Sequence, residues 1–518
     1  MVKTATKVLC AIGLAALLLA PTVLAFFSGG YFDEPRLVAG IGAWVVVIVA
    51  AVVSPRPLPR LWPGRMALGG LALLAAVVGL SITWAPLKGP ALADFERVLL
   101  YVAVAVAATA FLAWRPLARL VEPALAFGAL AVIGYALSDR VLPGVVHQQH
   151  SASAGGRLEQ PLTYWNAMGA LAAIGFVLCT RLAGDIRRPA LMRATAAAAT
   201  APLAAGIWLS YSRGAILATA VAIVVLALVA RSRPQLVAIV ISGCAGLVSA
   251  VAAELLHGVR SLEGSLSSRE ADGLVMLAVF ALAMGAAAAA QLLAARRERS
   301  GRISGAPIRW PRWLYAVLGV SIAVLLVVAV TITASKERPR VAQQPVFGAT
   351  AQRLQSFESN RYAYWKVALR MFADHPLKGG GSHSFAVDWI QKRKIVDPAK
   401  DAHSLYIETA AELGLLGLAA LALFLTGAVA AAGRARRLDP ALAAGPIAAG
   451  CVWLVHTGLD WDWEMPAVSL IALVLMAALV AASEQPAMAL SSSPAPPEAS
   501  PPTDPPPPSV PAGAPAGA

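Results

Sequence analysis

The sequence is poor in charged residues. Asp, Glu, Lys and Arg make up only 14% of its 518 residues, whereas a soluble domain carries roughly 25%. Hydrophobic residues reach 58%. This balance excludes a soluble globular enzyme, because such a chain must expose much of its surface to lipid. The same balance excludes intrinsic disorder for most of the sequence.

Cysteine and the common catalytic signatures are scarce as well. The four cysteines all lie in apolar runs, and no paired-cysteine spacing occurs, so a disulfide framework and a cysteine metal site are not expected. The nucleotide-binding pattern GxxxxGK[ST], the hydrolase pattern GxSxG and the zinc pattern HExxH are all absent. An ATPase is therefore rejected, even though a glycine run follows Lys378.

Long apolar runs are abundant. A spanning helix needs about 20 mostly apolar residues, and fourteen segments qualify. The first exceeds the apolar core of about 7–15 residues in a signal peptide, so we expect a retained helix there. The fourteen segments are 7–27, 37–53, 66–84, 97–113, 118–138, 164–183, 192–210, 214–230, 235–256, 271–293, 313–333, 408–432, 443–458 and 464–482. The predicted fold is all-α, a polytopic membrane protein with about 12–14 transmembrane helices and one long extracytoplasmic loop.

Charge predicts the orientation. With the N-terminus in the cytoplasm, the inner connections carry 22 Lys and Arg and the short outer connections carry 8, Arg97 among the latter. Positive residues favour cytoplasmic loops, so the net charge of +14 indicates membrane topology and not nucleic-acid binding. We expect a multi-pass protein of the cytoplasmic (inner) membrane with both termini in the cytoplasm. All seven histidines then fall on the outer side.

Four regions follow from this pattern. Residues 1–333 hold about eleven transmembrane helices, 334–406 form the extracytoplasmic loop, and 407–483 hold about three more helices. Residues 484–518 are a proline-rich cytoplasmic tail that cannot build a core and is expected to be disordered. The tail is either inert or binds a proline-recognising partner.

The long loop contains an amphipathic segment, Glu358–Asp374. Its large apolar side chains share one helical face, which is expected to lie among lipid headgroups. The basic side chains beside that face would meet lipid phosphates. A Pro- and Gly-rich turn, HPLKGGGSHSF, ends the segment, and DAHSLYIETAAELGLLG then places His403 just before a helix that enters the membrane. The residues of the apolar face are Tyr362, Trp365, Leu369 and Phe372, and the basic ones are Arg361, Lys366 and Arg370.

Three shorter motifs carry polar residues beside the membrane. Arg213, in LSYSRGA, either ends a span or points into an outer cavity and binds an anion, because an unpaired charge at the bilayer centre costs roughly 2.5–3.5 kcal/mol. LTYWNAMGA is either an interfacial aromatic belt with Asn166 as a helix cap or a polar patch. HTGLDWDWEMP places four polar residues at the outer rim, either as rim charges or as partners for arginines: His456, Asp460, Asp462 and Glu464.

NRYAYWKVALRMFADHPLKGGGSHSF and DAHSLYIETAAELGLLG, with LTYWNAMGA and YSRGA, resemble the O-antigen ligase family, whose superfamily includes O-antigen polymerases and protein O-oligosaccharyltransferases. The resemblance covers most of 1–483, although the family usually has about twelve spans. It implies transfer of a glycan from a polyprenyl diphosphate to an envelope glycan, lipid or protein acceptor, without metal or cofactor. It also implies that Arg213 and Arg361 bind the diphosphate and that His403 acts in catalysis. Ser404 stands where the family often has Asn.

The residue types suit that chemistry. Arginine stays protonated and offers a planar fork to phosphate oxygens, and histidine can accept the proton of an attacking hydroxyl near neutral pH. Lys378 is a weaker candidate for substrate binding. Attack opposite to the leaving diphosphate would invert the anomeric centre.

Two other functions stay open. A transporter or flippase would carry ionisable residues near the middle of its spans, whereas these span interiors are nearly free of charge. A non-catalytic scaffold for envelope assembly would not need His403 or Arg213. The sequence does not decide between ligase and polymerase.

Overall fold

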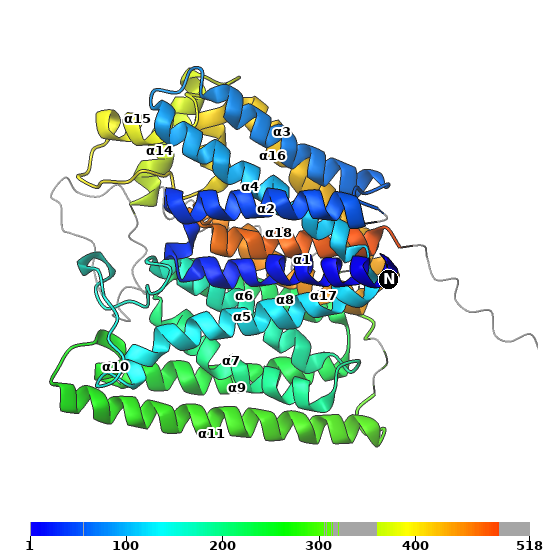
Figure 1. Ribbon diagram of the computed structural model, residues 1–518. Coiled ribbons are helices and arrows are strands. Elements are labelled where there is room, and N and C mark those ends of the chain that lie inside the picture. Colours follow the sequence, from blue (N-terminus) through cyan, green and yellow to red (C-terminus); the bar gives the residue numbers. More distant parts are fainter. Residues whose placement is uncertain are drawn as a thin grey trace, which may run out of the picture. The chain divides into compact units, whose positions relative to one another are not determined.

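A computed structural model describes residues 2–311 except Pro55, Gly305 and Pro307, together with Trp313, Val320 and residues 360–485. The expected span 313–333 and the first part of the long loop therefore fall almost wholly outside the described residues. All regular elements within the described ranges are helices, and Figure 1 shows most of them running side by side.

Thirteen described helices are long and apolar enough to cross a membrane. They are α1 (Val2–Ala25), α2 (Asp33–Val53), α3 (Trp62–Ser81), α4 (Lys88–Leu112), α5 (Arg115–Val141), α6 (Trp165–Gly184), α7 (Ala190–Leu209), α8 (Arg213–Ala230), α9 (Arg233–Leu255), α11 (Leu266–Arg299), α16 (Leu405–Leu438), α17 (Pro440–Thr457) and α18 (Pro466–Ser483). The shorter elements are η1 (Ser28–Gly30), η2 (Ala152–Ala154), α10 (His257–Ser261), α14 (Arg361–Asp374), α15 (Ser384–Lys392) and η3 (Asp462–Glu464).

These helices confirm the polytopic all-α fold and every expected span outside 313–333. One boundary was wrong in a way that matters. The fourth span was expected to begin at residue 97, with Arg97 counted among the outer connections, but α4 already begins at Lys88. Asp94 and Arg97 are therefore buried inside a helix, so the span interiors are less free of charge than the sequence suggested.

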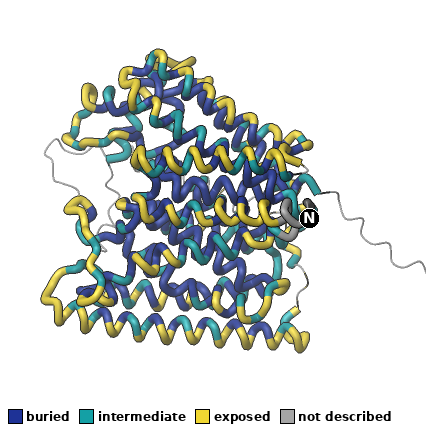
Figure 2. Tube along the Cα trace, viewed as in Figure 1, coloured by how far each residue is buried: buried dark blue, intermediate teal, exposed yellow. Residues whose placement is uncertain are grey.

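Helices α6 and α18 form the centre of the bundle. The most apolar stretch of α6 is wholly buried and that of α18 is 94% buried, whereas the figure for α2 is 17%. Figure 2 shows this contrast as dark central helices beside α2 and α11, whose outer faces are exposed. A helix that is apolar on every side belongs in a core or in lipid. The exposed apolar faces of α2 and α11 are consequently the surfaces that would meet lipid.

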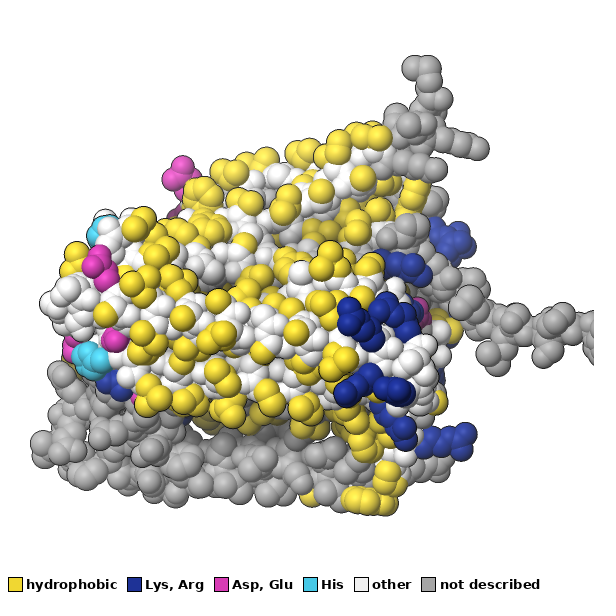
Figure 3. All heavy atoms as spheres, turned by 90° about the horizontal axis from the view of Figure 1, so that it is seen from below, with side chains coloured by type: hydrophobic (Ala, Val, Ile, Leu, Met, Phe, Trp, Pro, Cys, Tyr) yellow, Lys and Arg dark blue, Asp and Glu magenta, His cyan; other side chains and the backbone are white. Residues whose placement is uncertain are grey.

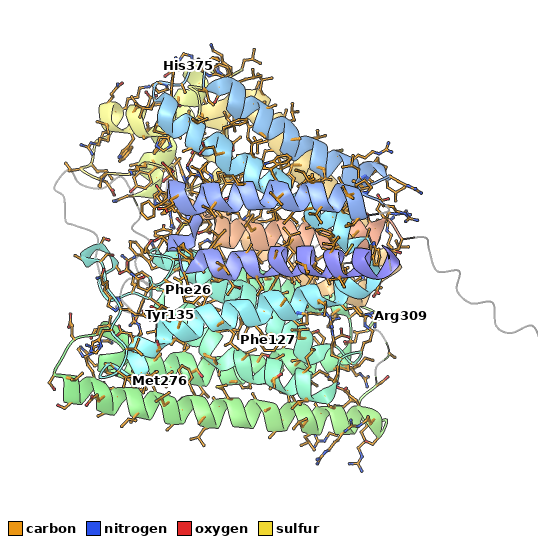
Figure 4. All side chains as sticks on the ribbon, in the orientation of Figure 1. Phe26, Phe127, Tyr135, Met276, Arg309 and His375 are labelled. Carbon is orange, nitrogen blue, oxygen red and sulfur yellow. The ribbon has the colours of Figure 1, made fainter. Side chains whose placement is uncertain are left out.

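The two ends of the bundle differ in charge. On the face shown in Figure 3, Lys and Arg gather at one end, whereas His, Asp and Glu lie at the other. Figure 1 places α14 and α15 at the second end and the N-terminus at the first. Figure 4 likewise separates the labelled His375, close to α14, from Arg309 at the opposite end. The loop helices thus lie at the end away from the N-terminus.

Helix α16 is broken where the glycine turn meets it. Gly414 has φ 62° and ψ −154°, far from helical values, and a Cβ at that position would lie 2.5 Å from the carbonyl oxygen of Leu377. The turn supplies the missing backbone partners, since Gly381 N–H donates to the Glu412 carbonyl at 2.8 Å and Leu415 N–H donates to the Pro376 carbonyl at 2.8 Å. Irregular backbone at membrane depth needs partners of this kind.

The hydrogen bonds at this break hold α14 and α15 against the first part of α16. The side of α14 that packs inward is not the apolar face noted in the sequence. The buried residues are Tyr364, Val367, Ala368 and Met371, which pack with Phe385 and Trp389 of α15. Leu369, on the predicted apolar face, is 52% exposed, whereas Trp365 of the same face is partly buried against the cluster, so only part of that face stays available for lipid headgroups.

Candidate functional site

The segment between α17 and α18 lies at the centre of the candidate site. Sequence analysis placed its four polar residues at the rim, but the structure buries all of them, with His456 and Asp462 at 0% exposure. Rim charges are therefore ruled out for this segment. The alternative, that its acidic residues are partners for arginines, is confirmed by ion pairs of Asp460 with Arg361 and of Glu464 with Arg97.

Asp460 joins the loop helix α14 to the bundle. Its carboxylate pairs with the guanidinium of Arg361 and accepts a hydrogen bond from the Tyr164 hydroxyl at 2.6 Å. Burial opposes ionisation of this carboxyl, yet the charge of Arg361 outweighs it and holds the pKa of Asp460 below its usual value. A permanently ionised Asp460 fixes where the Arg361 guanidinium lies.

Two residues of the LTYWNAMGA motif, Tyr164 and Asn166, lie next to Asp460. The expectation that Asn166 caps α6 was wrong, because Asn166 is inside the helix and its amide donates to the Tyr164 hydroxyl at 2.8 Å. The ring of Tyr164 packs on Trp461, with centroids 4.3 Å apart. Asn166 and Tyr164 thus complete a hydrogen-bonded chain that ends at Asp460, and they are not part of a lipid-facing belt.

His403 lies against the same group of residues. Its ring centroid is 5.0 Å from that of Tyr364, one turn after Arg361, and 6.5 Å from that of Trp461, which follows Asp460. Its Nδ1 is 2.9 Å from the Asp401 carbonyl oxygen. Because a carbonyl can only accept, the proton of this contact is on Nδ1. The ring is only partly buried, and a neutral ring of this tautomer has its lone pair on Nε2.

Arg213 opens α8, next to the segment between α17 and α18. Ser212 caps this helix by accepting from Ala215 N–H at 3.2 Å, and the Ser212 hydroxyl also lies 3.2 Å from Nε2 of His456. His456 in turn contacts Asp462 through Nδ1. Arg213 is therefore tied to the segment that binds Arg361, although the two arginines come from helices far apart in the sequence.

Lys378 is not part of this group in the described contacts. It is exposed, and its Nζ lies 5.2 Å from the ring centroid of Trp84, between α3 and α4. Its proposed role in substrate binding stays a prediction.

A second polar group lies beside the first. Arg97 bridges Asp94, at 3.0 Å, and Glu464, and these residues line a cavity together with Glu408, Glu412, Trp461 and Trp463. His383 lies 3.7 Å from Asp94. Burial favours its neutral ring, but hydrogen bonding and the charge of Asp94 raise the pKa of His383 to about 9.

Three carboxylates, two of which line this cavity, lie close enough to hold a cation. Carboxylate oxygens of Asp401, Glu408 and Glu464 lie within 4.8 Å of one another. Burial raises the pKa of Asp401 and of Glu464 above their usual values, so protonation is one way to relieve their repulsion and a bound cation is another. Sequence reasoning did not bring these three carboxylates together, because they lie in separate segments: the loop before α16, α16 itself and η3.

The architecture and the site define a class before any comparison is made: a polytopic helical membrane protein with a cationic and imidazole-bearing site at one end of its helices. A family model described as O-antigen ligase matches residues 274–422. This match, which covers less than half of the chain, supports an O-antigen ligase superfamily protein, as the resemblance predicted. The matched range includes Arg361, Lys378 and His403 but not Arg213. No curated protein matches the chain.

Proposed function

We propose that the chain transfers a glycan from a polyprenyl diphosphate, such as undecaprenyl diphosphate, to an envelope acceptor, with inversion and without metal. The acceptor is a glycan, a lipid or a protein. The reaction takes place on the outer side of the cytoplasmic membrane, and both termini lie inside. The family match supports glycan transfer in general, and the clustering of Lys and Arg at the end that carries the N-terminus supports this orientation (Figure 3).

One observation carries the proposal: His403 packs on Tyr364, which is one turn from Arg361 on α14. This places a base beside a permanent cation. In the proposed reaction, an acceptor hydroxyl attacks the anomeric carbon while Nε2 of His403 takes its proton. The bond from that carbon to the diphosphate oxygen breaks, and the diphosphate keeps the electron pair.

The arginines act on the leaving group. Charge grows on the diphosphate as the bond breaks, and fixed donors aimed at developing charge are often the largest catalytic contribution. A guanidinium offers five N–H donors, so Arg361 can bind an oxygen of the diphosphate while Asp460 keeps its orientation. Arg213, at the start of α8, would add donors from the opposite side, together with the positive end of the helix dipole.

Transfer by the purified full-length protein in nanodiscs, with a polyprenyl-diphosphate glycan as donor, tests this function. We expect His403→Ala, Arg361→Ala and Arg213→Ala each to lower the rate at least about a hundredfold, in the range that general-base and charge-stabilising groups contribute. Matched controls are His375→Ala and Arg370→Ala, which remove exposed side chains of the same types at α14. Unchanged rates in the three site variants would refute the mechanism.

The same preparation separates the competing functions. Uptake of a polyprenyl-linked glycan into sealed vesicles without transfer would establish a flippase. Envelope glycan assembly that is lost on deletion of the protein but restored by an Arg213→Ala/His403→Ala double variant would establish a scaffold.

A further inference from the structure

The side chains of Ser212, His456 and Asp462 form a continuous buried chain that starts next to Arg213. The Ser212 hydroxyl lies 3.2 Å from Nε2 of His456, and Nδ1 of His456 contacts the Asp462 carboxylate. All three residues are at most 3% exposed. The two contacts of His456 use both ring nitrogens, so the position and the tautomer of the ring are determined together.

With a neutral His456 ring that carries its proton on Nδ1, the hydrogen bonds in this chain run in one direction. Ser212 Oγ accepts from Ala215 N–H, which leaves the hydroxyl proton available for Nε2 of His456. Nδ1–H then donates to Asp462 Oδ2, while no described residue donates to the other oxygen of Asp462. A buried carboxylate with one unused oxygen is costly, so its retention needs a reason beyond packing.

Gly214 of the SRG motif leaves room for the His456 ring. A Cβ at Gly214 would lie 3.2 Å from both Cδ2 and Nε2 of His456, which is closer than carbon atoms normally approach. A glycine at this position lets the imidazole reach Ser212. The Ser and the Gly that flank Arg213 therefore both serve the contact with His456.

The Asp462 end of this hydrogen-bonded chain lies close in sequence to the residues that contact Arg361 and His403. Asp462 lies two residues after Asp460, which binds Arg361, and Trp461 between them faces His403. The short segment from His456 to Asp462 is thus attached to α8 at one end and to α14 at the other.

We propose that Ser212, His456 and Asp462 are positioning residues that hold Arg213 in a fixed relation to Arg361 and His403. This inference rests on the proposed function, because it assigns these residues to the binding of the same diphosphate. None of the three has to touch substrate. Their effect is exerted through the side chain of Arg213, at the first position of α8.

A double-mutant cycle tests the inference. The measured quantity is the affinity of the full-length protein for farnesyl diphosphate, a short polyprenyl diphosphate. We expect Ser212→Ala to weaken binding about tenfold in the wild-type background and to have no further effect in an Arg213→Ala background. Ser212→Thr, which keeps the hydroxyl, should restore affinity to within about twofold. Thr219→Ala is the matched control, because it removes a hydroxyl from α8 that bonds only within the helix.

His456→Asn provides a second route should Ser212→Ala fail to fold. It can keep a contact with Asp462 but is too short to reach Ser212, so the same tenfold loss is expected. Equal losses from Ser212→Ala with and without Arg213, or an equal loss from Thr219→Ala, would overturn the inference.

Transfer assays on the same variants separate the two proposals. A non-additive cycle in a protein that transfers no glycan would refute the transferase function but not the positioning role. Glycan transfer together with an additive cycle would refute the positioning role alone. A wild-type protein that does not bind the diphosphate would refute both.

Discussion

Arg361 on α14 is ion-paired with Asp460, which lies 99 positions further along the chain. This contact attaches the loop helix to the segment between α17 and α18, and Asp460 is 1% exposed. The pair therefore orients the Arg361 guanidinium, which is proposed to bind the diphosphate, and it also ties two parts of the fold together.

Asp460→Asn tests whether this buried ion pair contributes more than an ordinary ion pair on the surface. Removing one charge of a buried pair leaves the other uncompensated and costs about 3 kcal/mol, so we expect a lower unfolding temperature and a slower transfer reaction. Asp388→Asn is the matched control. Asp388 pairs with Lys392 at 3.0 Å on the surface, where such a pair contributes about 0–1 kcal/mol. Equal losses in both variants would contradict the orienting role.

The break in α16 predicts opposite effects for two glycines of one helix. Gly414→Ala places a side chain at φ 62° and against the Leu377 carbonyl, so we expect a loss of at least about 2 kcal/mol from backbone strain and steric conflict. Gly433→Ala meets no atom within 4 Å and should stabilise by up to about 1 kcal/mol, because alanine is the better helix former. Thermal unfolding of the two variants in the same detergent measures both effects.

His383 predicts a pH dependence of stability. Its folded pKa of about 9 lies above the ordinary value of 6.5, so the protonated ring stabilises the folded state. This contribution is complete below about pH 6.5 and is lost as the pH rises through 9. Asp94, Glu412 and Asp401 are the acidic groups responsible.

We expect the unfolding temperature of the wild type to fall more steeply between pH 6.5 and 9 than that of His383→Asn. Asparagine tolerates the positive φ of 61° at this position but does not titrate. Parallel curves for the two proteins would show that His383 gains no proton on folding.

Chelation tests the metal-independence of transfer. The carboxylates of Asp401, Glu408 and Glu464 are close enough to hold a cation, yet the proposed reaction uses only Arg213, Arg361 and His403. We therefore expect the same transfer rate in EDTA as in Mg²⁺, Mn²⁺ or Ca²⁺. A rate abolished by EDTA and restored by one of these ions would assign the cavity a catalytic metal.

The fold was largely predictable from the sequence for a physical reason. Each spanning helix satisfies its own backbone hydrogen bonds in lipid, so an apolar run of sufficient length specifies its own structure. The prediction failed at α4, where Asp94 and Arg97 resemble a loop. Their charges are buried because Arg97 pairs with both Asp94 and Glu464, and such pairing between distant segments leaves no local signal.

The site was predictable only in part. Arg361 and His403 stand out because they flank distinctive motifs, and the structure brings them together through Tyr364. The link from Arg213 to this group was not visible, because Ser212 and His456 are 244 positions apart. Contact of HTGLDWDWEMP with arginines was one of two interpretations of the sequence, but only the structure shows that Asp460 meets Arg361 and Glu464 meets Arg97.

The interruption at Gly414 also divides α16 into two independent lengths. An inserted residue normally rotates everything beyond it in a helix by about 100°. The backbone of the outer length is held by the glycine turn, so an insertion after Gly414 would turn only the membrane portion and leave His403 facing Tyr364. The outer length of α16 therefore takes its register from the glycine turn, whereas the membrane-spanning length takes its own from close packing on α3, where Gly427 lies against the Ala67 backbone.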